Sequence, residues 1–152
     1  MITIHAAQAG KSSLTEPILR ALPSWFGIEA ATQHYIDYTN AHPTFIAEQD
    51  QRAVGFLTLA EHSPYAAEIY VMAVLPDLHR RGIGRALVEA AQTDLRARRF
   101  EYLQVKTLAE SHPDEGYRQT RAFYHQIGFR DLEVFPELWS PANPCLQMIK
   151  RL

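Results

Sequence analysis

The sequence lacks several patterns that mark particular classes of protein. Its 152 residues include one cysteine, Cys145, which excludes an internal disulfide framework and agrees with a reducing compartment. The longest apolar run, from Ile69 to Leu75, is far too short to cross a bilayer. The first residues have neither the basic region nor the apolar region of a secretory signal. These absences predict a cytoplasmic protein with no membrane partner.

The sequence also lacks an excess of charge of one sign and any cluster of histidines. Lysine and arginine number 15 against 17 aspartates and glutamates, so the formal net charge of -2 predicts no nucleic-acid partner. The seven histidines form no HxH or HExxH pair and none pairs with the cysteine, so we expect no metal site. A lone Cys145 in an apolar setting is more typical of a small buried side chain than of a nucleophile.

What the chain does contain is an even succession of short periodic segments. The composition, 47% hydrophobic and 21% charged, suits one domain over residues 1–152 with its own core. Ser13 and Glu16 have the spacing of a capping box, and Gly128 is placed to cap a helix. Strands are predicted at 1–6, 44–49, 53–60, 66–74, 102–108, 130–135 and 146–150, and helices at 13–22, 29–40, 83–98 and 117–127. The order predicts a mixed α/β fold.

A glycine turn links strand 66–74 to the most clearly amphipathic helix. The turn reads His79-Arg80-Arg81-Gly82-Ile83-Gly84-Arg85, and no acidic residue lies between Asp77 and Glu89. At a helix start, unpaired N–H groups and the positive dipole end attract anions, and glycine lets a phosphate approach the backbone. A bound pyrophosphate would suit this place. A tight connection with solvated arginines is the alternative, and the turn is neither a Walker A loop nor a dinucleotide fingerprint.

Two segments together resemble signatures of the GNAT superfamily of acetyl-CoA-dependent N-acetyltransferases. Residues His79–Gly84 are similar to its acyl-CoA pyrophosphate loop, and residues 122–129 to its helix ending in Tyr-x-x-x-Gly-Phe. The order of elements along the whole chain is also similar. The resemblance implies a central, mixed, mostly antiparallel sheet of about seven strands flanked by about four helices. The chain departs from the pattern at His79, where Gln or Arg is usual, and at Tyr117, where many members carry Asn.

The resemblance further implies that acetyl-CoA is the co-substrate and shows where it should bind. The strand before the loop should splay, so that backbone groups near Met72 and Val74 pair with the pantetheine arm. The expected cofactor-binding residues are Met72, Ala73, Val74, His79, Arg80, Arg81, Gly82, Ile83, Gly84, Arg85, Thr120 and Phe123.

Two residues are expected to handle protons. Tyr124 would return a proton to the departing CoA thiolate, since a phenol has a pKa of about 10. The resemblance to the histone-acetyltransferase branch implies that Glu68 takes the proton of the amine, because a carboxylate desolvated between apolar neighbours can act as a base. A core aromatic and a solvent-facing strand residue are the respective alternatives. Direct transfer in a ternary complex needs no covalent enzyme intermediate, which agrees with the absence of any Ser/His/Asp or Cys/His arrangement.

The acceptor, a small-molecule or peptide amine, is less clearly encoded. Family resemblance directs attention to Trp25, Phe26, Tyr35, Tyr38, His112 and Trp139, each of which packing would explain as well. The loop 109–115 is acidic and would favour a cationic acceptor, unless it is simply solvated; His112 within it is an alternative base. A non-catalytic acyl-CoA-binding sensor and an unrelated anion-binding module remain competing hypotheses, and the last strand or the loop near Trp139 would allow a homodimer.

Overall fold

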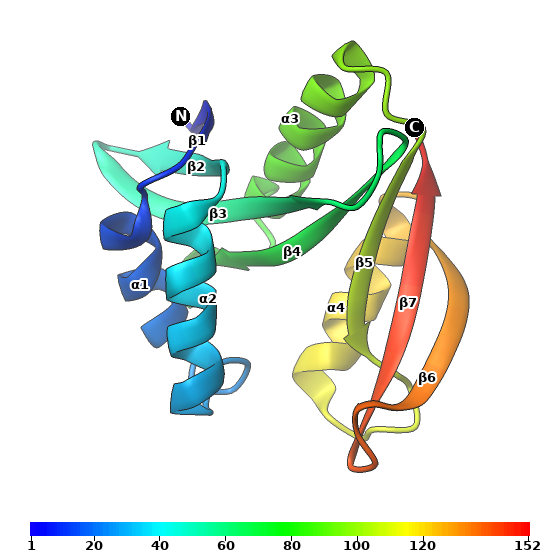
Figure 1. Ribbon diagram of the computed structural model, residues 1–152. Coiled ribbons are helices and arrows are strands. Elements are labelled where there is room, and N and C mark those ends of the chain that lie inside the picture. The colour runs from blue at the N-terminus through cyan, green and yellow to red at the C-terminus, as the bar shows by residue number, and fades with distance from the viewer.

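A seven-stranded sheet with helices on both faces organises the chain (Figure 1), and the computed structural model describes all residues from Met1 to Leu152. The strands are β1 (Thr3–Gln8), β2 (Thr44–Gln49), β3 (Arg52–Glu61), β4 (Ala66–Val74), β5 (Tyr102–Leu108), β6 (Arg130–Ser140) and β7 (Asn143–Arg151). The helices are α1 (Ser12–Arg20), α2 (Glu29–Ala41), α3 (Ile83–Ala97) and α4 (Glu115–Gln126), with a 3₁₀ turn at Pro76–Leu78. The predicted element order and mixed sheet are confirmed.

The sheet has the strand order β1-β2-β3-β4-β5-β7-β6, and its one parallel pair lies between β4 and β5. That pairing runs only from Ala66 opposite Tyr102 to Ile69 opposite Val105. The register between β3 and β4 shifts at the next residue, so that Tyr70 has no partner of its own and forms a β-bulge. Beyond the bulge β4 stays with β3 while β5 turns away, as Figure 1 shows.

Helices cover the two faces of the sheet separately. Figure 1 shows α1 and α2 on the face opposite to α3 and α4. Helix α3 buries one stripe of side chains at three- and four-residue spacing, as its sequence predicts: Ile83, Leu87, Val88, Ala91 and Leu95. The same core includes Phe56 and Leu57 of β3, both fully buried. No helix has the length and apolarity that spanning a membrane requires.

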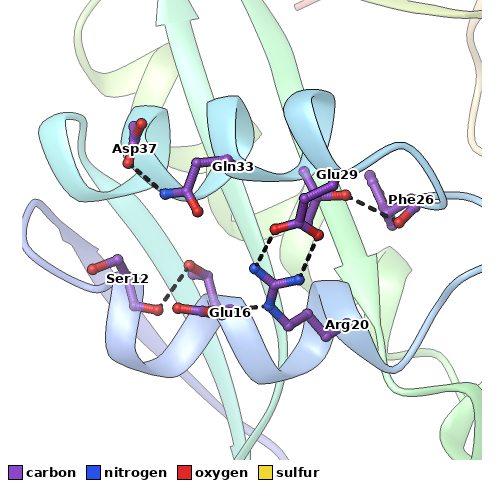
Figure 2. A network of polar contacts seen from close by, with 9 residues as sticks. Ser12, Glu16, Arg20, Phe26, Glu29, Gln33 and Asp37 are labelled. Atoms are coloured by element: carbon purple, nitrogen blue, oxygen red, sulfur yellow. Dashed lines mark hydrogen bonds and ion pairs between the residues drawn. The ribbon is translucent and has the colours of Figure 1, made fainter.

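An arginine ties α1 to α2 (Figure 2). The Arg20 guanidinium donates from Nε to Glu16 at 2.8 Å and from its two terminal nitrogens to Glu29 at 2.9 and 3.0 Å. Hydrogen bonding to Arg20 lowers the pKa of Glu29. Next to this clasp, the Thr32 hydroxyl donates to the Phe26 carbonyl at 3.0 Å. These bonds fix both ends of the α1–α2 loop, which carries Trp25 and Phe26.

The helix ends differ in how far the sequence predicts them. Gly128 adopts a φ of +103° after α4, and the next N–H, that of Phe129, donates to the Tyr124 carbonyl at 2.9 Å; this confirms the predicted glycine cap. The capping box at Ser13 is wrong, because α1 begins one residue earlier and has no side-chain cap. Its start is held instead by α2, where Asn40 accepts a hydrogen bond from the Ser12 hydroxyl at 2.9 Å.

The last two strands are longer than predicted. β6 continues to Ser140 and β7 starts at Asn143, so the expected loop 139–144 is a tight hairpin. β6 is an edge strand and most of its residues are exposed, which leaves no clear alternation of apolar and polar residues in the sequence. Pro136 also argues against a strand there, although an edge strand tolerates it because one side needs no donor.

Candidate active site

A cleft of about 900 Å³ opens where β4 and β5 part. Its walls come from the second half of β4, from Val105 to Thr107 of β5, and from the facing sides of α3 and α4. The α1–α2 loop, Tyr35 of α2 and the end of β6 complete it. Figure 1 shows that these helices lie on both faces of the sheet. The cleft that they line therefore passes between β4 and β5.

The edge of β4 that faces the cleft carries unpaired backbone groups. The Leu75 N–H donates to the Val54 carbonyl of β3 at 2.9 Å, and alternate residues of an antiparallel strand point the same way. Met72 and Val74 therefore direct their N–H and carbonyl groups away from β3, toward the gap that β5 has left. The predicted splay of this strand is present in the structure.

The start of α3 presents a row of free N–H groups at one end of the cleft. No backbone or side-chain acceptor takes a hydrogen bond from the N–H groups of residues 80 to 85, and the first bond of the helix is from Ala86 to the Gly82 carbonyl at 3.0 Å. Arg80 and Gly82 both lie in the left-handed region, with φ of 63° and 80°. Alternation of this kind turns neighbouring N–H groups into one concave surface that suits an anion.

Gly84 sets how closely α3 approaches α4. A Cβ atom at Gly84 would lie 3.2 Å from Cζ of Phe123, so the ring occupies the space that a side chain would take. Thr120, one turn before Phe123, also lines the cleft, and its hydroxyl donates to the Gly116 carbonyl at 3.1 Å. The contact places α4 beside the free N–H groups of α3.

Trp25 bridges the open end of the gap. Its ring packs against the α-carbon of Gly116, where a Cβ atom would come within 2.8 Å of the indole, and it meets the His79 ring edge to face at 5.8 Å between centroids. The Tyr117 hydroxyl donates to the Trp25 carbonyl at 3.3 Å. Burial raises the pKa of Tyr117 to about 12. His79 in turn bonds through Nε2 to the Val74 carbonyl at 2.7 Å, which occupies one acceptor on the β4 edge.

Tyr124 lies in the cleft wall with little exposure and no protein partner for its hydroxyl. The residue is 5% exposed and packs edge to face with Phe123 and Phe129, at 5.3 and 5.4 Å between centroids. Burial raises the pKa of Tyr124 well above its ordinary value. The phenol therefore holds its proton at neutral pH and has a free hydroxyl with which to donate it.

Glu68 stands in a polar network rather than among apolar groups, so the surroundings expected for it from the sequence are wrong. It is 5% exposed, and its Oε1 accepts from His62 Nε2 at 2.7 Å, from Gln104 Nε2 at 3.1 Å and from Lys106 Nζ at 3.0 Å. Lys106 also reaches Oε2, at 3.3 Å. The carboxylate is held in place by an ion pair whose partner comes from the neighbouring strand.

Most of the predicted residues meet in this cleft. Its lining contains Tyr124, Glu68 and all the expected cofactor-binding residues except Arg81, which is exposed outside it. Ile83 and Ala73 have buried side chains, so what they offer is backbone. Of the residues predicted for the acceptor, the cleft contains Trp25, Phe26, Tyr35 and Trp139.

Other predicted residues lie elsewhere. Tyr38 does not line the cleft, and His112 lies in a separate pocket beside α4. No residue of the acidic loop 109–115 reaches the cleft, which removes the basis for predicting a cationic acceptor from it. Cys145 is buried outside the cleft, and burial raises the pKa of its thiol to about 11. No three His, Cys, Asp or Glu side chains gather as metal ligands.

Sequence reasoning missed Lys106, Tyr70 and Leu138. Lys106 had a signal, because it is a charged residue between Val105 and Thr107 in a strand that is otherwise mostly apolar. Tyr70 lies at the bulge, which depends on the register with β3 and leaves no mark in the sequence. Leu138 lies two residues after Pro136 in an edge strand, where the alternation of apolar and polar residues is weak.

Comparisons with known proteins agree with this geometry. A family model described as an acetyltransferase (GNAT) domain matches residues 40–131. An uncharacterized N-acetyltransferase of Chlorobaculum tepidum is 26% identical over 121 residues, which cover 78% of this chain and 67% of that protein.

Solved structures show the same fold at low identity. The ribosomal-protein-S18-alanine N-acetyltransferase from Escherichia coli has a TM-score of 0.78 at 18% identity, covering 99% of this chain and 94% of that one. A GNAT family acetyltransferase from Elizabethkingia anophelis with acetyl-CoA bound has a TM-score of 0.71 at 19% identity, covering 99% and 98%.

The Tyr117 bridge generates a prediction about stability. Tyr117→Phe should cost about 1 kcal/mol at pH 7, because the hydrogen bond to the Trp25 carbonyl is lost. The folded-state pKa of about 12 lies above the unfolded value of about 10, so the parent loses stability as pH rises from 10 through 12. Urea unfolding should show a smaller alkaline loss in the variant. Tyr65→Phe is the control, because Tyr65 is exposed and its hydroxyl makes no hydrogen bond. Equal alkaline losses of stability for the parent and Tyr117→Phe would contradict the assignment.

Proposed function

Because this chain belongs to the GNAT acetyltransferase family, we propose that it moves the acetyl group of acetyl-CoA onto a primary amine, with both substrates bound at once. The observation that carries the proposal is the cleft between β4 and β5, which has free N–H groups at one end, a free strand edge along one side and a buried phenol in its wall. The acetyl-CoA bound in the enzyme of Elizabethkingia anophelis supports the choice of acyl donor.

The residues of the cleft suit the pyrophosphate and the pantetheine arm of coenzyme A. The N–H groups of residues 80 to 85 would bind the pyrophosphate, with the side chains of Arg80 and Arg85 beside it in the lining. The backbone groups of Met72 and Val74 have the strand spacing that the amides of a pantetheine arm can pair with. Thr120 and Phe123 line the facing wall, on α4.

Two side chains would carry out the two proton transfers of the reaction. Bound acetyl-CoA would supply an activated acyl group, and breaking its C–S bond would release CoA as a thiolate that needs a proton. Tyr124 is placed in the wall with a protonated, unpaired hydroxyl and would donate that proton. Glu68, directly or through a water, would take the proton that the amine must lose, and its network holds it in one position.

A non-catalytic acyl-CoA sensor would need the cleft but neither of these groups. Such a protein would have no use for a phenol in the cleft wall whose protonated hydroxyl has no protein partner. The arrangement of Tyr124 beside Phe123 therefore favours an enzyme.

Binding of the pyrophosphate gives the first test. Arg85→Ala should raise the Kd of acetyl-CoA about tenfold in calorimetry, because a charge-assisted contact is lost from the cleft. Arg81→Ala removes the same charge from the exposed residue outside the cleft and should change the Kd little. Equal effects of the two variants would show that only the general positive field matters.

Direct transfer gives the second test. Initial-rate plots against acetyl-CoA and amine should intersect, because both substrates must be bound before a product leaves. The buried, protonated thiol of Cys145 is unsuited to carry the acetyl group. Parallel lines, together with an acetylated Cys145 in the mass spectrum, would instead establish a two-step route.

Removing the phenol proton gives the third test. Tyr124→Phe keeps the ring contacts with Phe123 and Phe129 and should lower kcat by roughly 10²- to 10⁴-fold, while the Kd of acetyl-CoA stays nearly unchanged. An unchanged kcat would make Tyr124 a core residue only.

Glu68→Gln is the contrasting variant, because it keeps the shape of the network but removes the charge. Its kcat/KM should fall near neutral pH and recover partly as rising pH deprotonates the amine in solution. Tyr124→Phe should show no such recovery. If the Glu68→Gln enzyme has the rate and pH profile of the parent, Glu68 has no role in proton transfer and serves only as the ion-pair partner of Lys106.

A further inference from the structure

Part of the cleft has walls of aromatic and apolar side chains. We call this part the acceptor chamber and define it by lining residues from three elements and one loop: Phe26, Tyr35, Tyr70, Leu138 and Trp139. The free N–H groups of α3 lie on the face of the sheet opposite to α1 and α2, so an acyl donor bound there leaves this chamber to the second substrate.

The aromatic wall is fixed before any substrate binds. Tyr70 stacks on Tyr38 with 3.8 Å between ring centroids, and Tyr38 stacks on His42 at the same distance. The Tyr70 hydroxyl also bonds to Nε2 of His34. Tyr35 meets Phe26 edge to face at 5.7 Å. A wall that needs no ordering on binding favours a flat or bulky apolar group at little entropic cost.

Charge in the cleft disfavours a substrate with several cationic groups. Glu68 is the only acidic side chain in the lining, and Lys106 already pairs with it at 3.0 Å. The remaining charged groups of the lining are Arg80 and Arg85, which are positive. A polyamine or an aminoglycoside would bring cations that find no free carboxylate here, and desolvating them unpaired is costly.

The volume limits the size of the substrate. The whole cleft, about 900 Å³, lies within the range of small-molecule sites, and the acyl end of the donor must share it with the acceptor. Trp25 bridges to α4 across the end of the gap and restricts the room for a longer chain. A small molecule fits these limits better than a peptide does.

From these observations we infer that the acceptor is a small primary amine with one aromatic or bulky apolar substituent and no second cationic centre. This inference rests on the proposed function and names its substrate class. The substituent packs against the side chains of the acceptor chamber, which leaves the amine to be delivered toward Glu68.

Matched amines test the inference. With acetyl-CoA saturating, we expect kcat/KM for 2-phenylethylamine to exceed that for ethylamine about tenfold or more, because only the first buries a ring in the chamber. Spermidine should do no better than ethylamine. A peptide with an amino-terminal phenylalanine carries the same ring and should be a poorer substrate than 2-phenylethylamine.

Two leucines of one strand provide a matched pair of variants. Leu138 and Leu132 are both 55% exposed on β6, but only Leu138 lines the cleft. Leu138→Ala should lower kcat/KM for 2-phenylethylamine at least threefold and leave ethylamine unchanged, whereas Leu132→Ala should change neither. Leu138→Asp should raise the use of spermidine relative to 2-phenylethylamine, since it supplies the missing carboxylate. Because both residues are exposed, folding should survive, and circular dichroism checks this.

The outcomes separate this inference from the proposed function. Preference for spermidine or for the peptide, or equal effects of Leu138→Ala and Leu132→Ala, would overturn the aromatic-amine assignment and leave the acetyltransferase in place. Binding of acetyl-CoA without acetylation of any amine would overturn the proposed function, and this inference with it. A tenfold preference that Leu138→Ala removes would support both.

Discussion

The pairing between β4 and β5 ends at Ile69 and Val105, and the rest of the molecule depends on that early end. Two parallel strands that stayed together would satisfy each other's backbone groups and close the sheet. Because they part, the backbone groups of Met72 and the N–H of Val74 keep no protein partner, which is unfavourable unless a ligand or water takes them. The sheet stays intact because β3 continues to pair with β4 and β7 with β5.

Small residues let the helices approach this gap closely. The Phe123 ring packs against Gly84 at the start of α3, and the Trp25 ring packs against Gly116 at the start of α4. The first contact positions α4 beside the free N–H groups of α3. The second contact connects α4 to the α1–α2 loop, whose two ends are held by the Arg20–Glu29 ion pair and by the Thr32 hydrogen bond. Two glycines that are far apart in the sequence thus shape two ends of one cleft.

The sequence predicts features that local chemistry determines. The stripe of α3, the glycine cap at Gly128 and the glycine turn with free N–H groups before Ile83 all follow from spacing, and the structure contains each of them. Features that need two distant segments were not predictable: the network of Glu68 with Lys106 and His62, and the bridge from Tyr117 to Trp25. The expected acidic acceptor loop failed for the same reason, since only the tertiary fold shows that 109–115 lies outside the cleft.

The bulge at Tyr70 has a consequence for how this strand tolerates changes of length. In a regular strand, side chains alternate between the two faces, but the extra residue reverses that alternation once between Glu68 and Met72. Deleting one residue from this stretch would therefore turn either the carboxylate or the cleft-facing backbone to the wrong side, although the strand could still pair with β3. Loops elsewhere can lengthen or shorten during divergence. Between Glu68 and Val74, by contrast, adding or removing one residue would reverse the side to which the later residues point.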